Sequence, residues 1–456
     1  MISNGVDPIY GDVPETWQLV SLGSLMDSKE AELVTGPFGT MLHASSYRLT
    51  GTPVVAVQHI GENRLKHVDL PRIDDETVNR LQRYKLKKGD ILFGRKGSVE
   101  RRAIIQEQEE GWLEGSDCIR LRFLSESISP NFISYVLGSA PFKDWIMRHA
   151  GGATMPSLNQ TILRLLPLPL PPLTEQQAIA RILGALDDKI DLNRRMNHTL
   201  EEMAHALFKS WFVDFDPVTA KAEGRVPFGM NAETASLFPA EFEETEEGSI
   251  PKGWKVGTTG DMVTVVGGTT PSTRKDEYWA GGTIAWATPK DLSGLAHPVL
   301  LNTDRKITPE GLKQISSGLL PAGTLLMSSR APVGYLAISE IPVAINQGFM
   351  AMHCDKGFSN YYVIQWLREN MENIISHANG TTFLEISKSS FRLIPAILTP
   401  EPIARKFSEI AGKLHARIVA NVKESNNLTA IREALLPQLL SGELRVKQAE
   451  KVIENM

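Results

Sequence analysis

The sequence has 456 residues, of which 42% are apolar and 22% charged. This composition is typical of a globular protein with real cores and excludes a disordered chain. No run approaches 18 uninterrupted apolar residues, and residues 1–15 lack the basic and apolar regions of a signal peptide, so we expect a cytoplasmic protein. The length predicts about two to four domains.

Charge is unevenly distributed along the chain. The net charge of -5 argues mildly against nucleic acid. Residues 64–102, however, hold 12 Lys and Arg against 6 Asp and Glu, whereas residues 226–250 hold six Glu and no basic residue. The basic stretch is either a solvated face or the footprint of a DNA-binding surface. The only two cysteines, Cys118 and Cys354, lie far apart, so we expect no disulfide and no zinc site.

The first part of the chain, residues 1–170, is predicted to form a globular α+β head. Short β-rich runs such as PVVAV (53–57) and DILF (90–93) alternate with glycine and proline. This pattern is typical of a domain built from short strands and turns.

A long helix is predicted at residues 171–216, followed by an acidic linker at 217–250. TEQQ (174–177) offers a capping-box start. Apolar and polar residues then recur in steps of four and three, which is heptad spacing. The positions are Ile179, Leu183, Leu186, Ile190, Asn193, Asn197, Leu200, Ala204, Leu207 and Trp211. A helix of roughly 35 to 40 residues would be about 55 Å long.

The second half of the sequence repeats the first. At an offset of 228, residues 149–212 align without a gap to residues 377–440, with 17 identities over 64 positions, where chance gives roughly four. At an offset of 234, residues 86–105 align to 320–339. We therefore predict a second head at residues 251–400 and a second helix with a tail at 401–456.

The second helix carries the matching heptad positions. They are Phe407, Ala411, Leu414, Ile418, Asn421, Ser425, Leu428, Arg432, Leu435 and Leu439. Because Pro400 and Pro402 interrupt the start seen at Thr174, we expect this helix to begin near Ile403.

These elements predict an α+β fold in which two long antiparallel helices join two heads, with a pseudo-twofold internal repeat. An apolar stripe of this length needs a partner, and the other copy supplies one, so we expect a coiled coil with one head at each end. Asn193 and Asn421 occupy equivalent positions of its seam. Either they are buried and fix the helix register, or they rotate to the water edge of the seam.

Two similar but non-identical heads on a stiff rod suit a linear target with two different signals at a fixed distance. Duplex DNA fits, because half-sites on one face recur about every 34 Å. Since the heads have diverged, the two half-sites should differ.

The sequence resembles the specificity subunits of type I restriction-modification systems. The resemblance rests on the head, helix, head, helix order and on ALFKSWFVDFDPV (206–218), ALLPQLLSGELRV (434–446), PLPPLTEQQAIARIL (169–183) and GGTTPS (267–272). It implies that each head is a target recognition domain, and that the helices set the spacer and bind two methyltransferase (modification) subunits. Restriction/translocase subunits would join them, and S-adenosylmethionine, Mg²⁺ and ATP would bind to these partners and not to this non-catalytic chain.

Base reading needs Arg, Lys, Asn or Gln at base edges, supported by cations and amides at phosphates. The candidate DNA-binding residues are Gln58, His59, Arg95, Lys96, Ser98, Arg101 and Arg102 in head one, and Thr269, Thr270, Arg274, Lys290, Arg330 and Gln347 in head two. The turn at residues 36–39 is a further candidate. The turns at 151–154 and 379–382 recur in both heads, which favours a structural or phosphate-binding role over reading of different bases.

A cluster at the end of the first helix is predicted to bind a partner protein. Its residues are Trp211, Phe212, Phe215 and Asp216. A run of aromatic residues at a helix end exceeds what one rod needs to bury. The alternative is that these residues cap the rod and pack on a head.

Several motifs are absent from the sequence. It has no GxxxxGK[ST] phosphate loop, no Asn/Asp-Pro-Pro-Tyr/Phe motif of the methyltransferases, and no metal-ligand spacing. Three alternatives stay open: the same recognition role in a methylation-only system or beside a fused partner, an autonomous nuclease with two DNA-binding heads, and a coiled-coil scaffold that binds no DNA.

Overall fold

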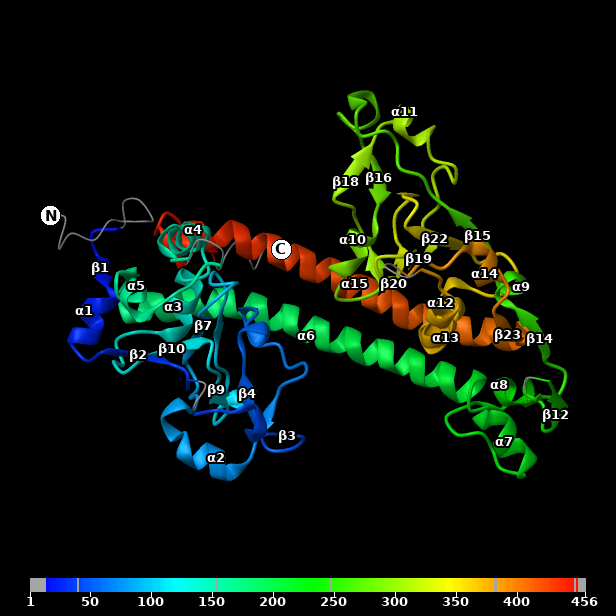
Figure 1. Ribbon diagram of the computed structural model, residues 1–456, viewed down its shortest axis with the longest axis horizontal. Helices are drawn as coiled ribbons and strands as arrows, with labels where there is room; N and C mark the ends of the chain where they lie inside the picture. The colour runs from blue at the N-terminus through cyan, green and yellow to red at the C-terminus, as the bar shows by residue number, and fades with distance from the viewer. Residues whose placement is uncertain are drawn as a thin grey trace. The chain divides into compact units, whose positions relative to one another are not determined.

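The computed structural model describes residues 14–38, 41–152, 155–246, 248–380, 384–446 and 448–449. The chain divides into two compact units (Figure 1). The first comprises Met1–Ile190 and Asn427–Met456, and the second comprises Asp191–Asn426. Each unit contains one head and a part of each of two long helices.

Head one is built around a five-stranded sheet. Its strands, in spatial order, are β2 (Ala31–Thr35), β10 (Cys118–Phe123), β7 (Ile91–Gly94), β8 (Arg102–Ile104) and β5 (Glu62–Asn63). All neighbours are antiparallel except β5 and β8. Successive side chains of β7 enter different cores, because Ile91 and Phe93 pack with the helices while Leu92 packs on the opposite face.

A second, smaller sheet and five short α-helices complete the main elements of head one among the described residues. The sheet consists of β3 (Tyr47–Arg48), β6 (Arg72–Ile73), β4 (Thr52–Val55) and β9 (Leu113–Glu114). Strands β1 (Gln18–Ser21) and β11 (Pro167–Leu170) form a separate pair. The helices are α1 (Leu22–Asp27), α2 (Asp75–Arg80), α3 (Pro130–Val136), α4 (Ala140–His149) and α5 (Gln160–Arg164). Side chains of Ser21, Asp74, Ser129 and Asn159 cap four of them, as expected for Ser, Asp and Asn.

Head two repeats the main sheet strand for strand and has a smaller sheet of three strands where head one has four, which confirms the internal repeat. Its main sheet has the order β15 (Thr264–Gly267), β22 (Phe349–His353), β19 (Leu325–Ser329), β20 (Val333–Ser339) and β17 (Val299–Leu300). The smaller sheet is β18 (Arg305–Ile307), β16 (Ile284–Ala287) and β21 (Ala344–Ile345), and β14 (Lys255–Thr258) pairs with β23 (Pro395–Leu398). Its helices are α9 (Thr259–Met262), α10 (Pro289–Ser293), α11 (Pro309–Leu312), α12 (Asn360–Glu369), α13 (Met371–Ser376) and α14 (Lys388–Arg392).

The two long helices are α6 (Leu173–Phe212) and α15 (Glu401–Leu440), each of 40 residues, at the top of the predicted range. Their starts differ from the predictions. The carbonyl of Pro172 accepts the first hydrogen bonds of α6, so Thr174 lies inside the first turn and is not the cap. Helix α15 begins two residues before Ile403, because a proline in the first turn loses only an N–H that has no helical partner there.

The predicted heptad positions face the interior. Every one of the twenty is buried or half-buried. In the first unit Asp187 of α6 meets Arg432 of α15, and Glu175 meets Arg445, which follows α15. In the second unit Asn197 meets Asn421 and Phe212 lies beside Phe407. The helix segments within each unit therefore run antiparallel, as predicted. No helix among the described residues combines the length and apolar character that crossing a membrane requires.

The segment expected to be an acidic linker contains defined structure. It holds α7 (Asp216–Ala222), α8 (Ala232–Ser236) and a hairpin of β12 (Phe242–Thr245) and β13 (Gly248–Pro251). Val218 and Phe238 are buried in the same core as Trp254 of head two. This segment is thus packed onto the second unit.

Candidate nucleic-acid interface

One edge of the main sheet in head one gathers several of the predicted DNA-binding residues. Strands β2 and β7 both pair antiparallel with β10, so the loops that follow them leave at the same edge. The guanidinium of Arg95, directly after β7, lies 5.4 Å from the centre of the Phe38 ring, which follows β2. Lys96 is exposed and Ser98 half-exposed. This edge therefore presents two cations and an aromatic ring together.

The loop after β7 is held in place by the turn at residues 151–158, which comes late in the sequence of head one. Gly97, at φ 81°, donates its N–H to the carbonyl of Pro156 at 3.0 Å. The N–H of Leu158 donates to the carbonyl of Arg95 at 2.9 Å, and Gly151 and Ser157 exchange two backbone hydrogen bonds. The recurring turn thus has a structural role here. Its residues 153 and 154 lie outside the described chain.

Head two has the same arrangement with different side chains. Asn379 and Glu385 exchange two backbone hydrogen bonds of 2.9 Å, and Ile386 donates to the carbonyl of Ser329. Arg330 corresponds to Lys96, and its Nη1 lies 3.7 Å from a carboxylate oxygen of Glu385. At this position head two therefore has a carboxylate beside the loop cation, whereas head one has the serine Ser157. Residues 381 and 382 of this turn are outside the described residues.

The turn after the first strand of each main sheet needs glycine. A Cβ on Gly36 would lie 1.9 Å from the carbonyl oxygen of Gly115, and one on Gly268 would lie 1.9 Å from that of Ile345. Backbone therefore packs on backbone at equivalent places in both heads. Phe38 and Thr270 follow at equivalent positions, whereas Gly39 is outside the described residues.

Gln58 and Lys290 also occupy equivalent positions. Each is the second residue of a short helix that follows β4 or β16, and each is exposed. Lys290 forms an ion pair of 3.4 Å with Asp304. Sequence comparison alone does not align these two residues, because the helices share no identity.

His59, beside Gln58, is poorly placed for a phosphate contact. It is 2% exposed, and its Nδ1 accepts the N–H of Ala56 at 2.9 Å. Burial lowers its pKa, partly opposed by a hydrogen bond to the backbone of Asp69. The neutral ring therefore acts as a cap for its own turn.

The remaining candidates of head two lie at the matching edge. The hydroxyl of Thr270 donates to the side-chain oxygen of Gln347, which is exposed. The hydroxyl of Thr269 lies 3.1 Å from that of Ser316. Arg274 is exposed in the same loop. The Thr270 bond orients the Gln347 amide with its NH₂ group as the remaining donor end.

The prediction that Arg102 contacts DNA has to be corrected, because its side chain is enclosed. Its neighbour Arg101 stays at the surface beside Glu100. Arg102 is 5% exposed, its Nε donates to the carbonyl of Ser134 at 2.7 Å, and burial lowers its pKa to about 10. A Cβ on Gly138 would lie 2.0 Å from its Nη2. A direct phosphate contact is inconsistent with this enclosure, so Arg102 has a structural role.

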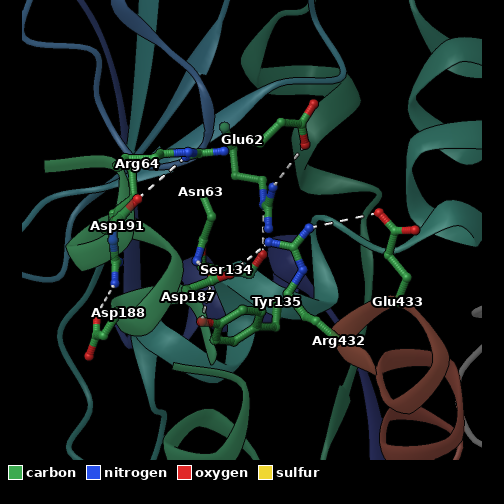
Figure 2. Close-up of polar contacts among 12 residues, drawn as sticks. Glu62, Asn63, Arg64, Ser134, Tyr135, Asp187, Asp188, Asp191, Arg432 and Glu433 are labelled. Atoms are coloured by element: carbon green, nitrogen blue, oxygen red, sulfur yellow. Dashed lines mark hydrogen bonds and ion pairs between the residues drawn. The ribbon is translucent and has the colours of Figure 1, made fainter. Parts of the chain in front are cut away.

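The structure reveals a buried polar network that the sequence reasoning missed (Figure 2). Asp187 of α6 accepts hydrogen bonds from Asn63 of β5 at 3.2 Å, from the Tyr135 hydroxyl of α3 at 2.8 Å, and from Arg432 of α15 at 2.6 Å. Burial and the nearby Asp187 carboxylate raise the pKa of Tyr135. Asp187 therefore ties head one to both helices. The available signal was Arg432, a charged residue at a heptad position.

Head two is tied to the helices at the equivalent position by different chemistry. His415 lies 228 residues after Asp187, and its Nε2 is 2.9 Å from Glu340 Oε1. His297 pairs with Glu201 of α6 at 2.7 Å, and Arg368 pairs with Glu202 at 2.6 Å. At equivalent positions, α6 thus supplies the carboxylate of Asp187 to head one and α15 supplies the imidazole of His415 to head two.

Asn193 and Asn421 lie within the helix seam. They are 0% and 1% exposed. Asn193 Nδ2 donates to Glu424 Oε2 at 2.8 Å, and Asn421 Nδ2 donates to Asn197 Oδ1 at 2.8 Å. The alternative at the water edge is therefore wrong, because both amides are enclosed. Their role in fixing the register stays a prediction.

The aromatic cluster at the end of α6 packs on a head, which was the alternative interpretation. Trp211 and Phe212 are 4% and 6% exposed. Phe212 lies 5.3 Å from Phe407 and 4.9 Å from Tyr362, measured between ring centres. These two rings thus belong to the core of the second unit and do not form an exposed surface. For half-buried Phe215 and exposed Asp216, partner binding stays a prediction.

The chain matches the family model described as the type I restriction modification DNA specificity domain over residues 14–202 and 251–433. It is 26% identical over 427 residues to the type I restriction enzyme HindI specificity subunit of Haemophilus influenzae, covering 84% of this chain and 92% of that protein. It is 24% identical over 454 residues to the putative MjaX specificity subunit of Methanocaldococcus jannaschii, covering 96% of each.

A solved structure shares the fold. The S subunit of a type I restriction-modification system from M. genitalium superposes with a TM-score of 0.57 at 15% sequence identity, covering 94% of this chain and 96% of that one. At this identity the likeness concerns the arrangement of the backbone alone.

Proposed function

Because the chain belongs to the family of type I restriction-modification DNA specificity subunits, we propose that each head reads one half of a bipartite, asymmetric duplex DNA target. Family membership makes the chain a specificity component and not a catalytic one. In this proposal the helices set the number of base pairs between the halves.

One observation carries this proposal: the same scaffold presents different side chains in the two heads. Strand register matches Phe38 of head one to Thr270 of head two. It likewise matches Gln58 to Lys290 and Ser157 to Glu385. Bases are distinguished by the donors and acceptors that side chains offer in the major groove. Two heads with one frame and different donors should therefore select different sequences.

The proposal assigns the chemistry to partner subunits. Two methyltransferase subunits would bind to the helices, and restriction/translocase subunits would complete the nuclease. S-adenosylmethionine, Mg²⁺ and ATP would be bound by those partners. In the described part of the chain, no three His, Cys, Asp or Glu side chains are grouped as metal ligands.

The test is to co-express the chain with the methyltransferase encoded beside it and to map methylated adenines across the host genome at single-base resolution. We expect a two-part asymmetric motif with a fixed gap. Gln58→Ala should relax or change one half only, and Lys290→Ala the other, since both residues are exposed at equivalent positions. A soluble, assembled complex that methylates no such motif would contradict the proposal.

A further inference from the structure

An exposed apolar loop projects from the segment between the end of α6 and head two. Val226 and Phe228, in the loop between α7 and α8, are 83% and 104% exposed. We call these two residues the apolar tip. A Val or Phe side chain left in water forgoes the free energy that its burial would provide, so two apolar residues this exposed in one short loop mark a candidate site of interaction.

The loop that carries the apolar tip is firmly held at its base. Gly224 and Gly229 adopt φ of 70° and 67°, a backbone region that favours glycine, on either side of the tip. The ammonium group of Lys221 donates to the carbonyls of Ala235 and Phe238, which joins α7 to the end of α8. Phe238 in turn is 2% exposed and packs against the Trp211 ring. The tip is thus displayed on a small platform anchored in the core of the second unit.

The segment that carries the apolar tip is acidic. Residues 214–250 contain nine Asp and Glu against two basic residues. Both basic side chains already have partners. Lys221 donates to the carbonyls of Ala235 and Phe238, and Arg225 Nε lies 2.7 Å from Glu223. Glu233 lies 3.9 Å from Lys406 and Glu241 pairs with Lys252, which offsets part of this charge, while Glu243 and Glu244 are exposed. Such a field repels the phosphates of DNA and attracts a basic surface.

We propose that the apolar tip docks into an apolar pocket rimmed by Lys and Arg on the modification subunit. This inference rests on the proposed function, because the chain must hold the methylating subunit in order to direct it. The tip supplies the buried contact, and the surrounding carboxylates supply long-range attraction and orientation. The contact lies apart from the faces of α6 and α15 that form the helix seam.

The experiment measures the affinity of the purified full-length chain for the modification subunit. The test variants are Val226→Asp and Phe228→Asp, which change residues outside the core. Leu49→Asp is the matched control, because Leu49 is 99% exposed but lies in head one. We expect each test variant to weaken binding at least tenfold and the control to bind like the wild type. Raising the salt concentration about tenfold should also weaken wild-type binding.

A photo-crosslinking phenylalanine analogue at position 228 should form a cross-link to a peptide of the modification subunit that contains Lys or Arg. Unchanged affinity of both test variants, or weaker binding of the restriction subunit alone, would overturn the proposal. If the methylation map gives a bipartite motif while the variants bind normally, only the apolar-tip proposal fails. If the map gives no motif, the proposed function fails first.

Discussion

At the scale of single residues, the contacts that join the heads to the helices are more informative than the candidate DNA contacts. Asp187 has a side chain that is 7% exposed and accepts bonds from three elements of its unit, whereas the neighbouring Asp188 is 73% exposed and pairs only at the surface with Arg64. Removing one partner from a buried network leaves the remaining buried charges and donors without a partner. Removing one partner of a surface pair leaves the other to be solvated by water.

We therefore expect Asp187→Ala to lower the free energy of unfolding by about 3 kcal/mol. Asp188→Ala should lower it by less than about 1 kcal/mol, because water screens that pair. Urea denaturation of the two variants beside the wild type measures both changes. Equal effects of the two substitutions would show that the Asp187 network contributes nothing beyond a surface ion pair.

The Glu340 carboxylate should make stability depend on pH. The hydrogen bond from His415 holds its pKa below the ordinary value. A depressed folded pKa contributes stability above the unfolded value of about 4.3, and this stability is lost as pH falls through the folded value. Glu340→Gln should therefore be less stable than the wild type at pH 7, and the difference should shrink below about pH 4. Denaturation curves at both pH values provide the test, and a constant difference would argue against this role.

At the scale of elements, the long helices are the parts in which sequence pattern and structure agree most directly. Heptad spacing buries one side of each helix, and Asn193 and Asn421 add polar contacts that other registers would leave unmade. Within the part of the chain that the structure describes, no group donates a hydrogen bond to the buried Asn193 Oδ1. A buried amide that is only partly satisfied costs stability, which fits a residue kept for register.

Adding one heptad beside Asn193 in α6 and one beside Asn421 in α15 should lengthen the spacer of the methylated motif. Seven helical residues add about 10 Å, which equals about three base pairs of DNA. Both half-site sequences should stay the same, because neither head is altered. The methylation map reads spacer and half-sites together. A changed half-site with an unchanged gap would show that the length of the helices does not set the length of the spacer.

At the scale of the whole molecule, the proposed function treats each head of the internal repeat as a separable reader, and each head has its own attachment to the helices. Head one meets an acid at position 187, and head two meets an imidazole at position 415. A foreign head therefore has to bring matching donors. In head one these are Asn63 and Tyr135.

Replacing residues 14–170 by the head of another family member that keeps these two donors should change one half of the target and leave the other half and the gap unchanged. A graft lacking them should give a less stable chain, since Asp187 would lose two of its hydrogen bonds. The readouts are the methylated motif and the unfolding midpoint. A change in both halves after a single exchange would rule out two independent readers.

The sequence by itself determined the repeat, the two long helices and the family, because each is carried by a period or by motifs along the chain. The 228-residue offset and the heptad positions are local patterns that packing then preserves. The sequence also identified the loops at the sheet edge, since glycines and cations concentrate there.

Only the tertiary structure decided which of those residues are enclosed and which are presented. Arg101 and Arg102 are neighbours of the same type, yet β8 turns Arg102 inward onto the Ser134 carbonyl while Arg101 stays at the surface. The Asp187 network joins residues 63, 135, 187 and 432. No local period links such distant positions, because their proximity depends on how the strands and helices of that unit pack. Packing within the second unit buries Trp211 and Phe212 and leaves Phe228 exposed.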